Sequence, residues 1–328
     1  MTAKKTIVSG ARPTGRLHLG NYHGALRYWM KLQDTHRCFF FVADWHALTT
    51  DYADPAQIAE NTIEMVLDWL AVGLDPARCV MFQQSAIKEH AELYLLFGMI
   101  TPVPWLERTP TYKEQREQIQ DRDLSTYGFL GYPLLQAADI LLYRADGVPV
   151  GIDQAPHVEL TREVARRFNT TYRALFPEPA TLLSEIPKIV GTDGRKMSKS
   201  YNNAVYLTEP AEDVDRKLSR MVTDPRRARR TDPGDPDDCP AYQSFHKAYC
   251  TPEELAYQAK GCRSASRGCL ECKQIMIKHV QAELEPIRAR RAKLGPDDAR
   301  RALEAGNAAA HAVAEATMAD VRGAMGLG

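Results

Sequence analysis

The chain has 328 residues, 44% of them hydrophobic and 26% charged, which is enough for one large domain and a smaller one. Its 42 basic and 42 acidic residues cancel, and a neutral total is compatible with a locally basic face. The sequence shows no signal-peptide core and no apolar stretch of the roughly 18 residues that a membrane span needs. We therefore expect a cytoplasmic protein without a membrane segment, whose seven cysteines are thiols or metal ligands rather than disulfides.

Short apolar runs alternate with helix-length segments in the first half of the chain. Residues 6–9 form an apolar strand, and residues 18–33 have the apolar spacing of a helix. Residues 38–43 are a dense apolar run, as in a buried parallel strand. A helix is expected from residue 54 to about 72, and a further strand at residues 79–83. This alternation predicts an α/β domain with a Rossmann-like parallel sheet.

The second half of the chain has a different residue pattern, typical of helices rather than strands. Strand-like runs largely disappear, and the helical patterns carry arginine and lysine on their polar faces. A basic cluster at residues 226–230 precedes a loop rich in proline, glycine and aspartate, and residues 297–325 read as an alanine-rich amphipathic helix. We predict a Rossmann-like catalytic domain over residues 1–195 and a mainly helical domain over residues 196–328.

A glycine-rich segment, SGARPTGRLHLGN at residues 9–21, follows the first predicted strand. A doubly wound sheet places its ligand at such a turn. Backbone N–H groups at the start of the next helix favour phosphate, and His18 and Asn21 add side-chain donors. The dinucleotide-binding glycine pattern is absent, so the glycines alone fit a structural turn as well as a phosphate site.

A second segment, GRKMSKS at residues 194–200, places Lys196 and Lys199 three positions apart among hydroxyl residues. Lysine is a point charge on a flexible stem, which suits a mobile clamp on a polyphosphate, although a solvated basic loop would read the same way. Together the two segments closely resemble the paired signatures of class I aminoacyl-tRNA synthetases, usually written HIGH and KMSKS. The second signature is intact, and the first reads HLGN.

This resemblance implies an ATP site in which His18, Asn21, Lys196 and Lys199 are catalytic and magnesium lies on the phosphates. They would stabilise the transition state in which an amino acid carboxylate attacks the α-phosphorus, without a covalent enzyme intermediate. Asparagine at position 21 keeps a donor but cannot carry charge. The ATP-binding residues implied are Arg12, Pro13, Thr14, Gly20, Asn21, Gly151, Ile152, Asp153, Lys196, Met197, Ser198, Lys199 and Ser200.

A third segment, residues 131–151, is apolar almost all round at its centre and predicts a buried helix. Tyr132, Gln136 and Asp139 lie on one face of that helix. A buried aspartate is costly unless something donates to it. The carboxylate would therefore cap a neighbouring helix, pair with an arginine, or accept a hydrogen bond from a ligand.

The same segment, with residues 148–162 (VPVGxDQxxHxELTR) and DWHALTT at 44–50, resembles tryptophanyl-tRNA synthetases, and the similarity covers nearly the whole chain. It implies that Asp139 accepts a hydrogen bond from the indole N–H of tryptophan. Sites of that kind reject analogues without the donor by roughly four to five powers of ten. Ile152 stands where such enzymes often carry glutamate. The tryptophan-binding residues implied are Asp139, Tyr132, Gln136, Gln154, His46 and Gly10, with Tyr132 and Gln154 on the ammonium and carboxylate and Gly151 and Asp153 on the ribose.

Four cysteines in the second half, Cys239, Cys262, Cys269 and Cys272, have the spacing C-x22-C-x6-C-x2-C. This spacing predicts a metal site, with free thiols as the alternative, and does not separate zinc from iron–sulfur. A subset of tryptophanyl-tRNA synthetases carries the same spacing and holds a 4Fe-4S cluster in the anticodon-binding domain. The resemblance therefore implies a 4Fe-4S cluster here, in a structural or RNA-recognition role.

Basic residues surround these cysteines. Arg263, Arg267 and Lys273 interleave with them, and residues 226–230 lie just upstream. These side chains would contact RNA phosphates or anticodon bases, or form a solvated surface. By resemblance, the chain is a homodimer that activates L-tryptophan with ATP and transfers it to tRNA(Trp). The alternatives are a tyrosyl-tRNA synthetase, a small-molecule nucleotidyltransferase of the same superfamily, or a non-catalytic iron–sulfur RNA-binding or redox-sensing protein.

Overall fold

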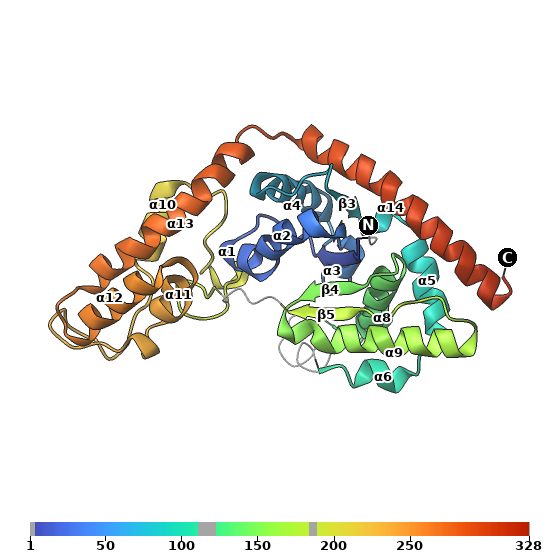
Figure 1. Cartoon of the computed structure of the whole chain (residues 1–328), viewed down its shortest axis with the longest axis horizontal. Coiled ribbons are helices and arrows are strands. Elements are labelled where there is room, and N and C mark those ends of the chain that lie inside the picture. Colours follow the sequence, from blue (N-terminus) through green and yellow to red (C-terminus); the bar gives the residue numbers. More distant parts are fainter. Residues whose placement is uncertain (1–3, 111–122, 184–188, 328) are drawn as a thin grey trace.

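The centre of the molecule is a five-stranded sheet in the order β3-β2-β1-β4-β5, with every neighbouring pair parallel (Figure 1). The computed structural model describes residues 4–110, 123–183 and 189–327. The predicted Rossmann-like parallel sheet is confirmed, and the first three strands lie close to their predicted bounds. The strands are β1 (Thr6–Ala11), β2 (Arg37–Val42), β3 (Cys79–Gln83), β4 (Gly147–Val150) and β5 (Ala180–Leu183).

Helices cover both faces of the sheet, so the strands are apolar on both sides. Ile7 and Phe40 face one core, which includes Trp29 and Trp69. Their neighbours along the strands face the other core with the apolar side of α8. The helices in this part are α1 (Leu19–Asn21), η1 (Tyr22–Leu26), α2 (Arg27–Thr35), α3 (Asp44–Asp51), α4 (Ile58–Val72), η2 (Gln84–Ala86), α5 (Glu89–Gly98), α6 (Val103–Glu107), α8 (Tyr127–Leu141), η3 (Ile152–Gln154) and α9 (Ala155–Thr171).

Two predicted helices differ in detail from the observed ones. The segment predicted at 18–33 is helical, but η1 is a single π-helical stretch between α1 and α2. Such π turns are frequent near functional sites. The helix expected from residue 54 begins at Ile58, because Pro55 belongs to a turn whose carbonyl accepts the Ile58 N–H.

The helical part of the chain adjoins the face of the sheet covered by α2 and α4 (Figure 1). Its core continues that of the sheet domain, because Leu218, Phe245 and Val280 belong to the same buried cluster as Trp29. No helix in the described ranges has the length and apolar character needed to cross a bilayer. The elements are η4 (Lys199–Tyr201), α10 (Ala211–Ser219), η5 (Pro236–Asp238), η6 (Tyr242–His246), α11 (Lys247–Tyr249), α12 (Pro252–Arg263), α13 (Cys269–Arg291) and α14 (Pro296–Met325).

The last helix, α14, leaves the helical part and runs back along the sheet domain (Figure 1). It packs on β3, the edge strand, where the Asn307 side-chain oxygen accepts the Gln83 N–H at 2.9 Å. Ala310, Ala314 and Met318 belong to the same buried cluster as Val8 and Phe39 of the sheet. An uncovered sheet edge invites pairing with other chains, and α14 covers this one. We expected residues 196–328 to form one helical unit, but α14 packs on the sheet.

Close packing of α14 on β3 predicts a large effect for Gly306→Ala. A Cβ at Gly306 would overlap the backbone carbonyl oxygen of Met81, which cannot move without disturbing the strand. We expect the free energy of unfolding, measured by urea denaturation, to fall by about 1–3 kcal/mol. Gly323→Ala in the same helix is the matched control, since a Cβ there meets nothing within 4 Å, and it should stabilise by about 0.5–1 kcal/mol. Equal stability of the two variants would contradict this account of the contact.

Candidate active site

A cavity of about 330 Å³ opens at the carboxyl ends of β1 and β4. The strand order reverses between these strands, and open α/β sheets bind ligands at such a point. The cavity is bordered by Gly10 after β1 and by Gly151 after β4. The residues predicted from the sequence that line it are Gly10, Arg12, His46, Tyr132, Gln136, Asp139, Gly151 and Gln154.

Asp139 is fully buried at this cavity and accepts hydrogen bonds from three side chains. His46 Nε2 lies 2.8 Å from Oδ2, and Gln84 Nε2 and His90 Nδ1 lie 2.8 and 2.6 Å from Oδ1. Burial acts to raise the pKa of Asp139, but the hydrogen bonds from His46 and His90 outweigh it and leave the pKa at about 2. The carboxylate is therefore ionised, and it has room for about one further donor among its four lone-pair sites.

The partners of Asp139 come from parts of the chain that the sequence did not connect with it. Gln84 lies in η2 and His90 in α5, and the other ring nitrogen of His90 is 2.9 Å from the Tyr143 hydroxyl. Neither partner was predicted as a site residue. Neither an arginine nor a helix N-terminus, the two structural alternatives, is among the hydrogen-bond partners found for Asp139 in the described ranges.

Tyr132 and Gln154 meet through His157, a cavity residue that was also missed. The Tyr132 hydroxyl is 3.1 Å from His157 Nε2, and His157 Nδ1 is 2.7 Å from the Gln154 side-chain oxygen. Gln154 in turn donates to Asp153 at 3.0 Å. Because the Gln154 oxygen can only accept, Nδ1 carries the ring proton and Nε2 accepts from the tyrosine. The spacing of Gln154 and His157 on one helical turn is the signal that was available.

Gly10 and Ile152 were both predicted as ligand-binding residues, but neither offers a side-chain polar group to the cavity. A Cβ at Gly10 would come within 2.5 Å of the Phe41 ring, so glycine lets that ring line the cavity. Ile152 is 60% exposed and is not part of the cavity lining. Gln136 lines the cavity and makes no side-chain hydrogen bond to the described residues. Its amide is therefore available to a ligand.

The two signature segments lie side by side. The Leu19 N–H donates to the Val205 carbonyl at 2.9 Å, which ties the HLGN turn to the chain that follows the lysines. The Gly20 N–H lies 3.4 Å from the Met197 sulfur. Lys199 donates to the Thr14 carbonyl, and burial, together with the charge of Arg16, lowers the pKa of that lysine. The structure thus brings together residues that the sequence separates by nearly 180 positions.

Asn21 completes the N-terminal cap of α1. The His18 N–H donates to Asn21 Oδ1 at 3.1 Å, and His18 Nδ1 accepts the Asn21 N–H at 3.3 Å, which is a capping box. Since Nδ1 accepts, the ring proton lies on Nε2, which can donate to a ligand. Burial and the charge of Lys199 lower the pKa of His18 to about 4, so its ring is neutral at neutral pH. Asparagine at position 21 therefore orients His18 without carrying charge.

Asn203, another residue missed from the sequence, fixes the lysine-containing loop. Its side chain is buried, accepts the Ser198 N–H at 2.8 Å and donates to the Lys196 carbonyl at 3.1 Å. Met197 is buried beneath the loop, whereas Lys196 and Ser200 are exposed. The loop therefore has a fixed base and a side chain, Lys196, that projects into solvent.

The buried histidines predict how stability depends on pH. Burial lowers the pKa of His18 and of His157 from 6.5 to about 4. Between these values the unfolded chain takes up protons that the folded chain does not. The free energy of unfolding should therefore fall as the pH is lowered from about 6.5 to about 4, as measured by urea denaturation at several pH values. His157→Gln should make that slope shallower, and an unchanged slope would rule out this contribution.

Cys239, Cys262, Cys269 and Cys272 all line one small pocket between η5, α12 and α13. Gly234 is packed against this pocket, since a Cβ there would lie 2.7 Å from the Cys262 sulfur. The sulfurs are not gathered as tightly as a single zinc ion with bonds of about 2.3 Å requires. The described residues contain one group of three cysteine, histidine or carboxylate ligands within 4.8 Å of one another, and it is not drawn from these four.

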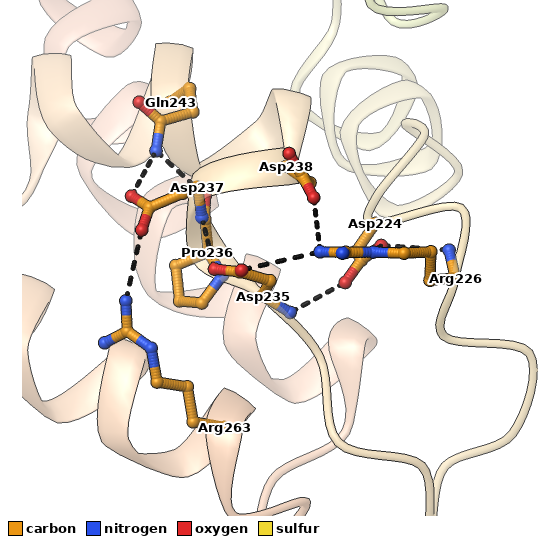
Figure 2. Close-up of polar contacts among 8 residues, drawn as sticks. All are labelled: Asp224, Arg226, Asp235, Pro236, Asp237, Asp238, Gln243 and Arg263. Atoms are coloured by element: carbon orange, nitrogen blue, oxygen red, sulfur yellow. Dashed lines mark hydrogen bonds and ion pairs between the residues drawn. The ribbon is translucent and has the colours of Figure 1, made fainter.

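Two of the arginines near this pocket, Arg226 and Arg263, form ion pairs with aspartates of the chain, as Figure 2 shows. Arg226 lies among Asp224, Asp235 and Asp238, and its guanidinium forms ion pairs with all three. Asp224 also accepts the Asp235 N–H at 2.7 Å, and Arg263 pairs with Asp237 at 3.3 Å. The aspartate-rich loop is therefore joined to the basic cluster by ion pairs, and both arginine side chains remain more than half exposed.

Lys273 was expected to contact RNA, and the structure contradicts this expectation. It is buried, and its ammonium donates to the backbone carbonyls of Ser219 and Met221 at 2.7 and 2.6 Å. It therefore joins α13 to the end of α10. Arg267 lies over the Tyr257 ring, with 3.7 Å from the guanidinium carbon to the ring centroid.

The chain is similar to proteins of one family along nearly its whole length. A sequence profile of the family described as tRNA synthetases class I (W and Y) matches residues 2–290. Tryptophan–tRNA ligase of Thermotoga maritima is 50% identical, and that of Aquifex aeolicus 45% identical, each over 98% of this chain and 99% of its own length. The solved tryptophanyl-tRNA synthetase of Campylobacter jejuni, complexed with ADP and tryptophan, is 30% identical with a TM-score of 0.85, and covers 98% of this chain and 100% of its own.

Proposed function

Since the chain belongs to the class I tRNA synthetases of the tryptophan and tyrosine family, we propose that it joins L-tryptophan to tRNA at the expense of ATP. The amino acid carboxylate attacks the α-phosphorus of ATP, the bond to pyrophosphate breaks, and the resulting tryptophanyl-adenylate transfers its acyl group to the tRNA 3′ end with release of AMP. The observation that carries the proposal is the cavity with Asp139 at its wall, beside the joined signature segments.

The ATP part of the site is proposed on the geometry of the two signatures. His18 Nε2 is a neutral donor held by the Asn21 cap, and Lys199 lies across the turn at Thr14. Lys196 projects from a loop whose base Asn203 fixes. These groups would hold the triphosphate and meet the charge that develops on it, so positioning and electrostatics supply the catalysis. Magnesium on the phosphates would lower the charge of the leaving pyrophosphate.

The choice of tryptophan is proposed on Asp139. The carboxylate is ionised and keeps acceptor capacity, so it suits the indole N–H. Tyr132, His157 and Gln154 form a polar chain along another wall, suited to the ammonium and carboxylate of an amino acid. A buried acceptor left without its donor costs binding energy, which disfavours side chains that lack an N–H at that place.

A 4Fe-4S cluster in the four-cysteine pocket is proposed on the donor set. All four thiols line one pocket, and their spread exceeds what one zinc ion requires, whereas a larger cluster is held by four cysteines at wider spacing. Cys269 and Cys272 come from the first turn of α13, with Cys262 on α12 and Cys239 after η5. The role proposed is structural, in fixing three segments of the RNA-binding part. Anaerobic purification with iron and sulfide analysis tests it, and a colourless protein with stoichiometric zinc would refute it.

We propose Arg229 and Arg230 as the tRNA-contacting residues of the basic cluster. Both are exposed and line a cleft with Leu270 and Gln274, next to Cys269. Phosphate contacts from such arginines position RNA, and the planar guanidinium of an arginine can also stack on an unpaired base.

A homodimer is proposed on an exposed apolar patch. Leu95 on α5, Met99 directly after α5, Val103 on α6 and Tyr127 on α8 are each more than half exposed, and both α5 and α6 contact α8. Large exposed apolar side chains gathered on neighbouring helices are typical of protein interfaces. Sedimentation analysis of Met99→Glu against the unchanged chain tests the dimer.

Amino-acid-dependent ATP–pyrophosphate exchange tests the activity itself. Exchange with tryptophan and not with tyrosine is the expected result. Exchange only with tyrosine would establish the tyrosyl-tRNA synthetase alternative. No exchange with any amino acid would favour the nucleotidyltransferase, or, if tRNA still binds, the non-catalytic RNA-binding protein.

A further inference from the structure

A second group of metal-ligand side chains lies beside the four-cysteine pocket and has no part in the activity proposed above. Cys250 follows α11, Glu254 is in the first turn of α12, and His279 is on α13. One ligand atom from each lies within 4.8 Å of the other two, and all three side chains are half-buried. Cys250 and Glu254 are four residues apart at the junction of α11 and α12, and packing of this junction against α13 brings His279 to them.

The chemistry of this set matches one class of ion. A thiolate, an imidazole and a carboxylate are protein ligands of zinc, with bonds of about 2.0–2.3 Å, so two ligand atoms on one tetrahedral ion lie about 3.3–3.8 Å apart. The Glu254 and His279 ligand atoms are 2.9–3.0 Å apart and the Cys250 sulfur lies within 4.8 Å of both, so side-chain rotations would be needed to admit an ion. We propose that Cys250, Glu254 and His279 bind one divalent ion of the zinc class, with the fourth coordination position open to solvent.

Neighbouring groups support the set. Glu254 Oε2 accepts the Thr251 N–H at 2.9 Å in the capping box of α12, which fixes the direction of the carboxylate. His279 Nε2 lies 3.0 and 2.9 Å from the two Glu254 oxygens, so the imidazole and the carboxylate face each other, and a bound ion would replace this direct contact. Second partners of this kind orient the ligands of metal sites.

His246 connects the proposed site with the four-cysteine pocket. It is buried, with Nδ1 3.5 Å from the Cys250 sulfur and Nε2 3.6 Å from the Cys272 sulfur. An ion on Cys250 would therefore be one imidazole away from the cysteine cluster. The proposed ion would join α11, α12 and α13 at the base of the cysteine pocket, independently of what that pocket holds.

The test compares zinc bound per chain, by equilibrium dialysis and elemental analysis, in the anaerobically purified protein and its variants. Cys250→Ser and His279→Gln should each bind one zinc ion fewer than the unchanged chain, with the same iron content. Glu254→Gln should keep the capping box, because glutamine can replace glutamate there. Its affinity for zinc should nevertheless be lower than that of the unchanged chain. His311→Gln is the matched control, because His311 pairs with Glu89 at 3.2 Å without a cysteine and should bind the normal amount.

Cobalt gives an independent readout. Added cobalt should produce a thiolate-to-cobalt charge-transfer absorption that the unchanged chain and His311→Gln share and that Cys250→Ser lacks. Equal zinc and identical cobalt spectra in the unchanged chain and all four variants would overturn the proposal. Loss of zinc only together with loss of iron would also overturn it, since the three residues would then act through the four-cysteine pocket.

Discussion

Replacement of Asp139 by asparagine is expected to lower kcat/KM for tryptophan about 10- to 150-fold, the equivalent of one hydrogen bond to a charged group. The KM for ATP should change little, because the hydrogen-bond partners of Asp139, which are His46, Gln84 and His90, all lie outside the signature segments. The diagnostic measurement is discrimination between tryptophan and an analogue in which sulfur replaces the indole N–H. The unchanged chain should reject the analogue strongly, and the variant much less.

Asp44→Asn is the matched control for this prediction. Asp44 is also a buried carboxylate, and it accepts the Ser85 N–H at 3.0 Å and a Gln83 amide N–H at 2.7 Å, but it does not line the cavity. This variant should lose stability and keep its discrimination. If both variants discriminate as the unchanged chain does, Asp139 is structural and does not contact the indole.

Replacement of Lys196 or Lys199 by alanine is expected to lower kcat about 10²- to 10³-fold, the cost of one donor to a developing charge. The KM for tryptophan should change far less, because neither lysine lines the cavity that we propose for the amino acid. Pyrophosphate exchange at saturating tryptophan, with kcat and KM determined separately, measures the split. A rise in KM with kcat unchanged would show that the lysines bind the ground state only.

Arg195→Ala is the control in the same loop. Arg195 is a neighbouring cation, but it is paired with Asp193 and lies over the Tyr201 ring. The Arg195→Ala variant should retain nearly full kcat. That result would show that kcat depends on the two lysines themselves and not on the total positive charge of the loop. Lysine-to-arginine exchange is a poor control here, since the planar guanidinium is not a compact point charge.

Local pattern was enough to predict the sheet and the general place of the site. Apolar runs such as residues 38–43 can be buried only as inner strands, and glycine turns at strand ends mark the ligand edge. The convergence of the four cysteines followed from their spacing. Asp139 was placed correctly in a buried helix because the helix is apolar all round.

Contacts between distant parts of the chain were beyond that reasoning. His90 and Gln84 reach Asp139 from 49 and 55 residues away, and no local pattern connects them. The basic run at residues 226–230 and the aspartates that follow it indicate that the two segments attract each other. Which aspartates pair with Arg226 depends on the path of the loop, and the sequence does not show that path. For α14, periodicity gave the helix but not the surface it covers. Small residues at 306, 310 and 314, spaced by four, were the one sign of close backbone contact.

The return of α14 to the edge of β3 determines how the two parts of the molecule can move. The helical part is inserted between the strands of the sheet and a helix that belongs to their core, so it is tethered at both ends. A doubly tethered insert can rotate about the line through its two attachment points, but it cannot swing as freely as a terminal appendage. Rotation about that line would also separate Leu218, Phe245 and Val280 from the buried cluster that they share with Trp29, so the helical part is held by its packing on α2 and α4 as well as by its two ends.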